Sequence, residues 1–193
     1  MIHIVLLTAP RGAGKTTACE RFHEQARAAG LLVGGIVAPA RFEQGGGKVG
    51  IDVVEAATGE RQLLATVEPE AGLRTVGPYR FDPAVMRWAL ERVLLALEVG
   101  VDVVLIDEIG PLELLFKGGF APALERLPQA EATAAILVVR SELLVALQEL
   151  LASLKPVTIA LTLSNRDQVP ARLFEEVWGH ISQCWAGNAD RDP

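Results

Sequence analysis

A short loop near the N-terminus constrains this chain more than any other feature. It follows an apolar run at residues 2–8, which has the composition of a buried strand, and it leads into a predicted helix. The loop fits the pattern Gly, four residues, Gly-Lys-Ser/Thr, in which backbone N–H groups surround a phosphate. With one further threonine, its residues are Ala9, Pro10, Arg11, Gly12, Ala13, Gly14, Lys15, Thr16 and Thr17. This arrangement predicts a P-loop that binds a nucleotide.

The chemistry of the loop follows from its residue types. Gly12 and Gly14 can adopt the positive φ that a nest of N–H groups requires. Ala9 stands where the pattern has its first glycine, and an alanine fits there if its φ is negative. The N-terminal dipole of the following helix favours an anion, Lys15 would reach the β- and γ-phosphates, and the Thr16 hydroxyl would be available to Mg²⁺. An ordinary glycine-rich turn before a helix is the alternative.

The composition favours one α/β domain. The chain has 193 residues, of which 50% are hydrophobic and 5% aromatic, so its core consists mainly of aliphatic side chains. Such a core is typical of a buried parallel sheet. The net charge is −6 and no basic cluster is present, which argues against a nucleic acid partner and favours a mononucleotide.

The cysteines and the apolar runs indicate the compartment. Cys19 and Cys184 are too few for a disulfide framework, which fits a reducing environment. The apolar runs are strand-length or broken by charge, so we expect neither a signal peptide nor a membrane span. A cytoplasmic protein is therefore expected, and its oligomeric state stays open.

Apolar runs and helical patterns alternate along the chain, as in a doubly wound α/β fold with a mostly parallel sheet. Further strands are expected at 31–38, 101–106, 134–139 and 156–163, and helices at 17–29, 83–98, 120–127, 141–154 and 169–183. Asp82 and Ser141 are expected to cap two of these helices. An antiparallel hairpin about Thr58-Gly59 is predicted in addition.

The domain plan is one P-loop domain at 1–186 and a polar tail at 187–193. The irregular stretch 66–83 is expected to be a connection, although Arg74, Tyr79 and Arg80 would suit a segment that covers a site.

A second motif supports the P-loop. The apolar run 103–106 ends at Asp107 and Glu108, and a strand of this kind commonly presents a carboxylate to the metal beside a P-loop. Asp107 would hold Mg²⁺ together with Thr16. Glu108 would either deprotonate the attacking water or make a second metal contact. A salt-bridged strand end is the alternative without function.

The segment 107–114, Asp-Glu-Ile-Gly-Pro-Leu-Glu-Leu, resembles the Asp-Glu-Ile-Gly-x-Met-Glu-Leu signature of the THEP1-type nucleoside-triphosphatases, the family that includes human cancer-related NTPase. Leu112 replaces the Met of the signature, and Ala9 replaces the first glycine of the family's P-loop. Segments 41–50, 58–60, 76–79 and 165–167 also agree, so the resemblance runs from about Ile4 to Asp167. The resemblance implies a RecA-like P-loop fold. It also implies an enzyme that hydrolyses ATP, GTP and other nucleoside triphosphates slowly and with broad base tolerance.

Several residues have more than one possible role. Glu113 could contact the metal site from behind or cap the following segment, and Arg11 could touch phosphate or point to solvent. Arg140 is placed to sense the γ-phosphate or to form a surface salt bridge, with Arg126 and Arg166 as rivals. Asn165 and Arg166 follow the last strand, where base contacts often lie, but their spacing is not that of the guanine-specific motif.

The first hypothesis is an Mg²⁺-dependent phosphohydrolase that converts a nucleoside triphosphate and water to the diphosphate and phosphate. A P-loop kinase would use the same loop with a small acceptor, but the region 110–128 lacks the arginine-rich lid typical of such kinases. A nucleotide-gated regulatory module, in which slow hydrolysis acts as a timer, is the third hypothesis.

Overall fold

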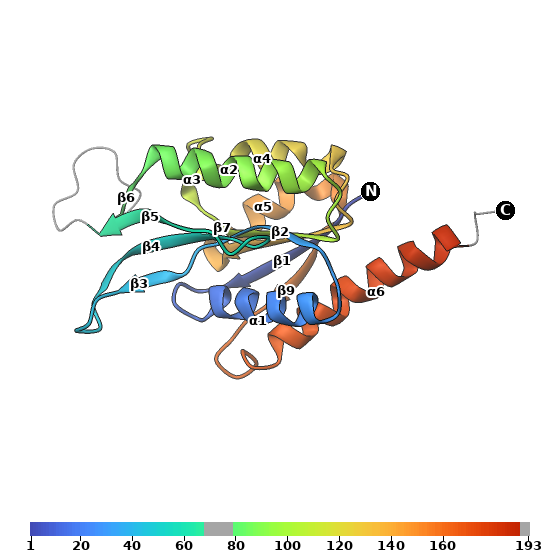
Figure 1. Cartoon of the computed structure of the whole chain (residues 1–193), viewed down its shortest axis with the longest axis horizontal. Helices are drawn as coiled ribbons and strands as arrows, with labels where there is room; N and C mark the ends of the chain where they lie inside the picture. The colour runs from blue at the N-terminus through green and yellow to red at the C-terminus, as the bar shows by residue number, and fades with distance from the viewer. Residues whose placement is uncertain (68–78, 190–193) are drawn as a thin grey trace.

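A computed structural model of the chain describes residues 1–67 and 79–189. Within them, nine strands form one sheet with helices on both of its faces (Figure 1). Arg74 and residues 76–78, which belong to the stretch expected to be a connection, lie outside the described residues.

Five parallel strands form the centre of the sheet. They are β1 (His3–Ala9), β2 (Val33–Val37), β7 (Val103–Ile109), β8 (Ala134–Arg140) and β9 (Val157–Ala160), and their order across the sheet is β2-β7-β8-β1-β9. Since the strands are parallel, their carboxyl ends share one edge. In the register Ala9 lies opposite Arg140, and Ile109 lies opposite Val139. The P-loop, Arg140 and the acidic motif are therefore neighbours at this edge, with β8 between β1 and β7.

Antiparallel strands extend the sheet beyond β2. They are β4 (Lys48–Glu55), β5 (Arg61–Val67) and β6 (Tyr79–Phe81), while β3 (Ala40–Phe42) pairs with β4. The hairpin predicted about Thr58-Gly59 is confirmed. The stretch expected to be a connection contributes β6 instead, so Tyr79 belongs to the edge of the sheet.

Helices cover both faces of the sheet, which confirms the doubly wound α/β fold. One face carries α1 (Lys15–Ala28) and α6 (Val169–Ala189), and the other carries α2 (Pro83–Glu98), α4 (Ala121–Arg126) and α5 (Leu144–Leu150) (Figure 1). Each layer buries its own cluster of aliphatic side chains, and Phe22 of α1 is a fully buried member of one cluster. In the described chain no helix is both long enough and apolar enough to span a membrane.

The sequence signals at helix ends have mixed outcomes. Asp82 caps α2 as predicted, since its side chain accepts hydrogen bonds from the N–H groups of Ala84 and Val85 at 2.8 and 3.2 Å. Ser141 makes no capping hydrogen bond. Instead of one helix over 141–154, α5 is flanked by 3₁₀ turns at Ser141–Leu143 and Ala152–Leu154. Pro156 disfavours a helical conformation at Lys155, so the last turn tightens and stops.

Three further boundaries differ from the prediction. Strand β7 runs through Asp107 and Glu108 to Ile109, and the short helix α3 (Pro111–Leu114) follows it. A third turn of 3₁₀ type follows α4 at Leu127–Gln129. Helix α6 continues to Ala189 and so includes the start of the expected tail, because Trp185 packs edge-on against Trp178 with ring centroids 5.8 Å apart.

The fold predicts where a truncation is most costly. Phe22→Ala should lower the free energy of unfolding by about 3–5 kcal/mol, because it leaves a cavity between α1 and the sheet. Phe116, whose side chain is 68% exposed, offers a matched control, and Phe116→Ala should change stability by less than about 0.5 kcal/mol. Urea denaturation of both variants measures the difference, and equal losses would contradict the described core.

Candidate active site

The P-loop takes its shape from two glycines. Strand β1 ends at Ala9 and helix α1 begins at Lys15, with Gly12 at φ 77° and Gly14 at φ 104° between them. These left-handed values are unfavourable for any other residue, as the sequence indicated. Ala9 belongs to the extended backbone of β1, so an alanine is compatible with this position.

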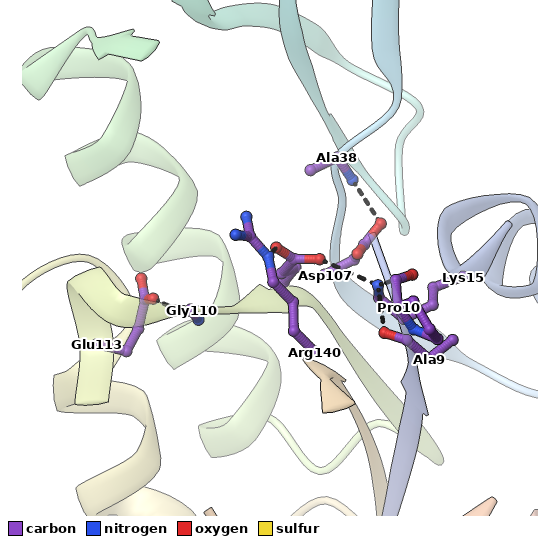
Figure 2. A network of polar contacts seen from close by, with 9 residues as sticks. Ala9, Pro10, Lys15, Ala38, Asp107, Gly110, Glu113 and Arg140 are labelled. Carbon is purple, nitrogen blue, oxygen red and sulfur yellow. Dashed lines mark hydrogen bonds and ion pairs between the residues drawn. The ribbon is translucent and has the colours of Figure 1, made fainter. Parts of the chain in front are cut away.

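Lys15 is almost completely buried at the start of α1, with 6% of its surface exposed. Its Nζ donates hydrogen bonds to the carbonyl oxygens of Ala9 and Pro10 at 3.1 and 3.2 Å (Figure 2). The same atom lies 3.6 Å from Oε2 of Glu108. The cation is therefore held above the loop, between its carbonyl oxygens and the acidic motif.

Asp107 is buried within β7, with 2% of its surface exposed. Its Oδ2 accepts a hydrogen bond from the N–H of Ala38, which follows β2, at 3.2 Å. The pKa of Asp107 is raised to about 6, mainly because the carboxyl is buried; hydrogen bonding to Thr16 opposes this rise, the negative charge of Glu108 adds to it, and the Ala38 N–H and the charge of Lys15 oppose it. A cation bound at this carboxylate would offset the cost of burying its charge.

Glu108 joins both sides of the site. Its Oε1 accepts a hydrogen bond from Nε of Arg140 at 2.6 Å, and its Oε2 faces Lys15. The side chain is 26% exposed, so water can reach it. Arg140, for which a sensor role and a surface salt bridge were both open, forms a salt bridge inside the site, to the residue predicted to act as the base. The peptide bond between Asp107 and Glu108 is cis.

A cavity of about 570 Å³ opens beside these residues. Its polar wall contains Lys15, Thr16, Asp107, Glu108 and Arg140. The opposite wall is mostly apolar and comes from the antiparallel strands, the start of α2 and the segment around α3. The P-loop and the acidic motif predicted from the sequence therefore face one common space.

Glu113 caps backbone groups, which was one of its two expected roles. Its Oε2 accepts from the N–H of Gly110 at 2.8 Å, and its Oε1 accepts from the N–H of Phe120 at 3.2 Å. Burial raises the pKa of Glu113, although these N–H groups lower it. The carboxylate thus links the two ends of the segment that follows β7. In Figure 2, Glu113 and Gly110 lie on one side of Asp107 and Arg140, and the P-loop residues lie on the other.

The other candidate arginines have different positions. Arg126 pairs with Glu98 at 3.0 Å, on residues that do not line the cavity. Arg166 and Asn165 do not line it either. Asn165 holds its own loop, since its Nδ2 donates to the carbonyl of Ala160 at 3.0 Å and its Oδ1 accepts from the N–H of Thr162 at 2.7 Å. Contacts from Asn165 and Arg166 to a base remain a prediction.

A cluster at the cavity wall was missed by sequence reasoning. Arg11 donates a hydrogen bond to the Tyr79 hydroxyl, and its guanidinium lies 5.4 Å from the centre of that ring. Nζ of Lys48 lies 4.9 Å from the same centre. Burial would raise the pKa of Tyr79, but the hydrogen bonding and charge of Lys48 and Arg11 lower it overall. Arg11 therefore turns toward a tyrosine, and only tertiary structure brings these three residues together.

Comparisons with known proteins agree with this geometry. A family model described as NTPase matches residues 4–174. Nucleoside-triphosphatase THEP1 of Methanopyrus kandleri is 38% identical over 184 residues, which cover 92% of this chain and 96% of the relative. The matched region includes the P-loop, Asp107 and Glu108.

Solved structures are similar as well. The solution structure of a human cancer-related nucleoside triphosphatase has a TM-score of 0.70 at 29% identity, over 90% of this chain and 95% of that one. The crystal structure of THEP1 from Aquifex aeolicus has a TM-score of 0.65 at 20% identity, over 88% and 96% of the two chains, and supports the fold.

The buried Asp107 carboxyl predicts a pH dependence of stability. Its pKa is about 6 in the folded chain and about 4 when unfolded, so the folded state keeps this proton to higher pH. Stability from this group is complete below about pH 4, and about 3 kcal/mol is lost as the pH rises through 6. Asp107→Asn should therefore gain stability relative to wild type over this range, in metal-free buffer with EDTA.

Urea denaturation at pH 4, 5, 6 and 7.5 measures this change, and Asp167→Asn, on an exposed carboxylate, is the control. A stability difference between Asp107→Asn and wild type that does not change with pH would contradict the raised pKa.

Proposed function

The chain belongs to the THEP1-type nucleoside-triphosphatase family and is a nucleoside-triphosphatase. From this premise, we propose that it hydrolyses nucleoside triphosphates slowly, that it uses Mg²⁺, and that it tolerates different bases. Lys15 binds the phosphates, Thr16 and Asp107 hold the metal, and Glu108 is the base for the attacking water. The observation that carries these assignments is the 3.6 Å approach of Lys15 Nζ to Glu108 Oε2 across the edge of the sheet.

The bonds of Lys15 explain how a triphosphate is received. Its Nζ lies between two carbonyl oxygens and a carboxylate, so it is desolvated and already aimed above the loop. Phosphate oxygens carry more negative charge than carbonyl oxygens and compete for the same protons. The N–H groups around Gly12 and Gly14 hold the rest of the phosphate chain.

Glu108 is the residue placed to activate water. The water oxygen bonds to the γ-phosphorus, the bond from that phosphorus to the bridging oxygen breaks, and the water proton passes to the Glu108 carboxylate. Arg140, held at Oε1 of Glu108 and lining the same cavity, would stabilise charge on the transferred group.

The residues present fit a magnesium ion. Mg²⁺ prefers oxygen ligands and usually takes one or two from the protein, with phosphate oxygens and waters as the others. Asp107 offers a buried carboxylate and Thr16 a hydroxyl beside it. No group of three or more His, Cys, Asp or Glu residues that could hold a metal by itself occurs at 1–67 or 79–189. Bound there, Mg²⁺ would withdraw charge from the phosphate oxygens.

Two contacts support slow and tolerant turnover. Both oxygens of Glu108 are engaged, one by Arg140 and one by Lys15, so the carboxylate must share these contacts with the attacking water, which slows proton removal. The amide of Asn165 is occupied by its own loop, so it offers little to distinguish one base from another.

The assigned base predicts that binding and turnover can be separated. Glu108→Gln keeps the size of the side chain but cannot accept the proton, so kcat should fall by about a hundredfold or more while triphosphate affinity is retained. Glu98→Gln, at an exposed ion pair with Arg126, is the matched control and should keep the wild-type rate. Phosphate release with ATP and Mg²⁺ is the measurement. An unchanged rate in Glu108→Gln would exclude this residue as the base.

Lys15→Ala should weaken nucleotide binding, unlike Glu108→Gln, because it removes the buried cation that holds the phosphates. Productive binding of ATP should be lost, which equilibrium dialysis with labelled ATP detects without turnover. Undiminished ATP binding in this variant would argue against the assigned phosphate site.

Broad base tolerance predicts steady phosphate release from ATP, GTP, CTP and UTP by the purified chain with Mg²⁺. Glu108→Gln should lose the release from all four, since the base of the nucleotide lies outside the reacting groups. Release from a single nucleotide would contradict the broad specificity but leave the hydrolytic site in place.

A further inference from the structure

We propose that the apolar end of the cavity beside Glu108 binds a small, uncharged organic alcohol, and that the chain transfers the γ-phosphoryl group to its hydroxyl as well as to water. The inference rests on the proposed function, because it uses the same phosphate loop and the same base. It adds a second substrate site and identifies the chemical class of its ligand.

The size of the cavity is the first argument. An attacking water occupies about 30 Å³, whereas cavities of about 300–1,000 Å³ are typical of sites for small organic molecules. The cavity here measures about 570 Å³. It continues past the reacting groups to side chains of β4, β5, β6, α2 and the segment around α3. Residues of the P-loop line the same cavity, so the phosphate chain takes part of this volume, and the apolar part is the space that hydrolysis by water does not use.

The lining of this far end is the second argument. Its side chains are aliphatic or aromatic, and they are Ile51, Leu64, Phe81, Met86, Leu112 and Phe120. A wall of this kind binds the apolar body of a ligand through burial of surface. Water alone would be poorly accommodated there, because it finds few hydrogen-bond partners.

The polar groups nearby indicate a ligand without charge. Both oxygens of Glu113 are already engaged by the N–H groups of Gly110 and Phe120. The cations Arg11 and Lys48 both lie against the ring of Tyr79. Glu108 lines the same cavity and lies 3.6 Å from Lys15, and Gly110, Pro111 and Leu112 of the wall follow it closely in the chain. One hydroxyl directed at Glu108 therefore satisfies the polar part of the site.

The nucleotide itself is not expected to fill this end. With Lys15, Asp107 and Glu108 in their proposed roles, the γ-phosphate would face the two acids, and the base is expected on the other side of the loop, near Asn165 and Arg166. Neither of these two residues lines the cavity. The apolar end thus lies on the side of the γ-phosphate where an acceptor approaches.

The transfer to the alcohol needs no further reactant. The hydroxyl oxygen of the alcohol bonds to the γ-phosphorus, and the bond to the bridging oxygen of the diphosphate breaks. The hydroxyl proton passes to the Glu108 carboxylate. A phosphate monoester and a nucleoside diphosphate leave. The arginine-rich lid that is absent from residues 110–128 is replaced in part by Arg140, which reaches Glu108 from β8.

Benzyl alcohol is the probe, because it combines a flat apolar body with one hydroxyl. Saturation-transfer NMR measures its binding to the full chain, and ³¹P NMR with ATP and Mg²⁺ measures benzyl phosphate and inorganic phosphate in one sample. Leu112→Trp fills the apolar end. Leu115→Trp, on the same turn but at a side chain that is 65% exposed and outside the cavity, is the matched control.

We expect benzyl alcohol to bind and benzyl phosphate to form with wild type and with Leu115→Trp. Both signals should fall at least tenfold in Leu112→Trp. Circular dichroism and ATP binding confirm that this variant is folded. Binding without benzyl phosphate, or equal signals in both tryptophan variants, would overturn the acceptor site.

The same spectra separate this inference from the proposed function. Inorganic phosphate that forms without the alcohol and depends on Glu108 supports the hydrolytic site, even if no ester appears. If that release does not depend on Glu108, the proposed base is wrong, and the acceptor mechanism built on it is wrong as well.

Discussion

The buried negative charge at the end of β7 is the constraint on which the site depends. Asp107 is 2% exposed and Glu108 follows it directly, and an unpaired buried carboxylate costs several kcal/mol. The chain compensates with Lys15 and Arg140 on Glu108, and with the Ala38 N–H on Asp107. Arg140 ends β8, Ala38 follows β2, and Lys15 begins α1 after the loop that follows β1, so the order of the strands decides whether these groups can reach the acids.

The order of the parallel strands brings the compensating cations to the acidic motif. Strand β8 lies between β1 and β7, and Arg140 at its end is level with Ala9. An arginine at this point reaches the acidic motif, while the P-loop brings Lys15 to the other oxygen of the same carboxylate. The antiparallel strands and the segment capped by Glu113 then add an apolar part to the cavity that the P-loop also lines. A base between two cations, beside an apolar space, suits slow hydrolysis and a second acceptor.

Local patterns in the sequence predicted much of this arrangement. Glycines before a lysine, an apolar run ending in two acids, and an aspartate before a proline each have a local physical cause, and the P-loop, β7 and the cap of α2 follow from them. The contact of Arg11 and Lys48 with Tyr79 has no such signal, because strand pairing brings the residues together. Glu113 was ambiguous and the cap predicted at Ser141 was wrong for the same reason, since a cap depends on where neighbouring backbone groups lie.

The division of labour between the two acids is the central claim, and the dependence of nucleotide affinity on metal tests it most directly. The ratio of the Kd for a fluorescent ATP analogue in EDTA to its Kd in Mg²⁺ should be well above one for wild type and for Glu108→Gln. In Asp107→Asn it should fall close to one, because the carboxylate proposed to couple metal and phosphate is gone. A ratio that survives in Asp107→Asn and collapses in Glu108→Gln would contradict the assignment.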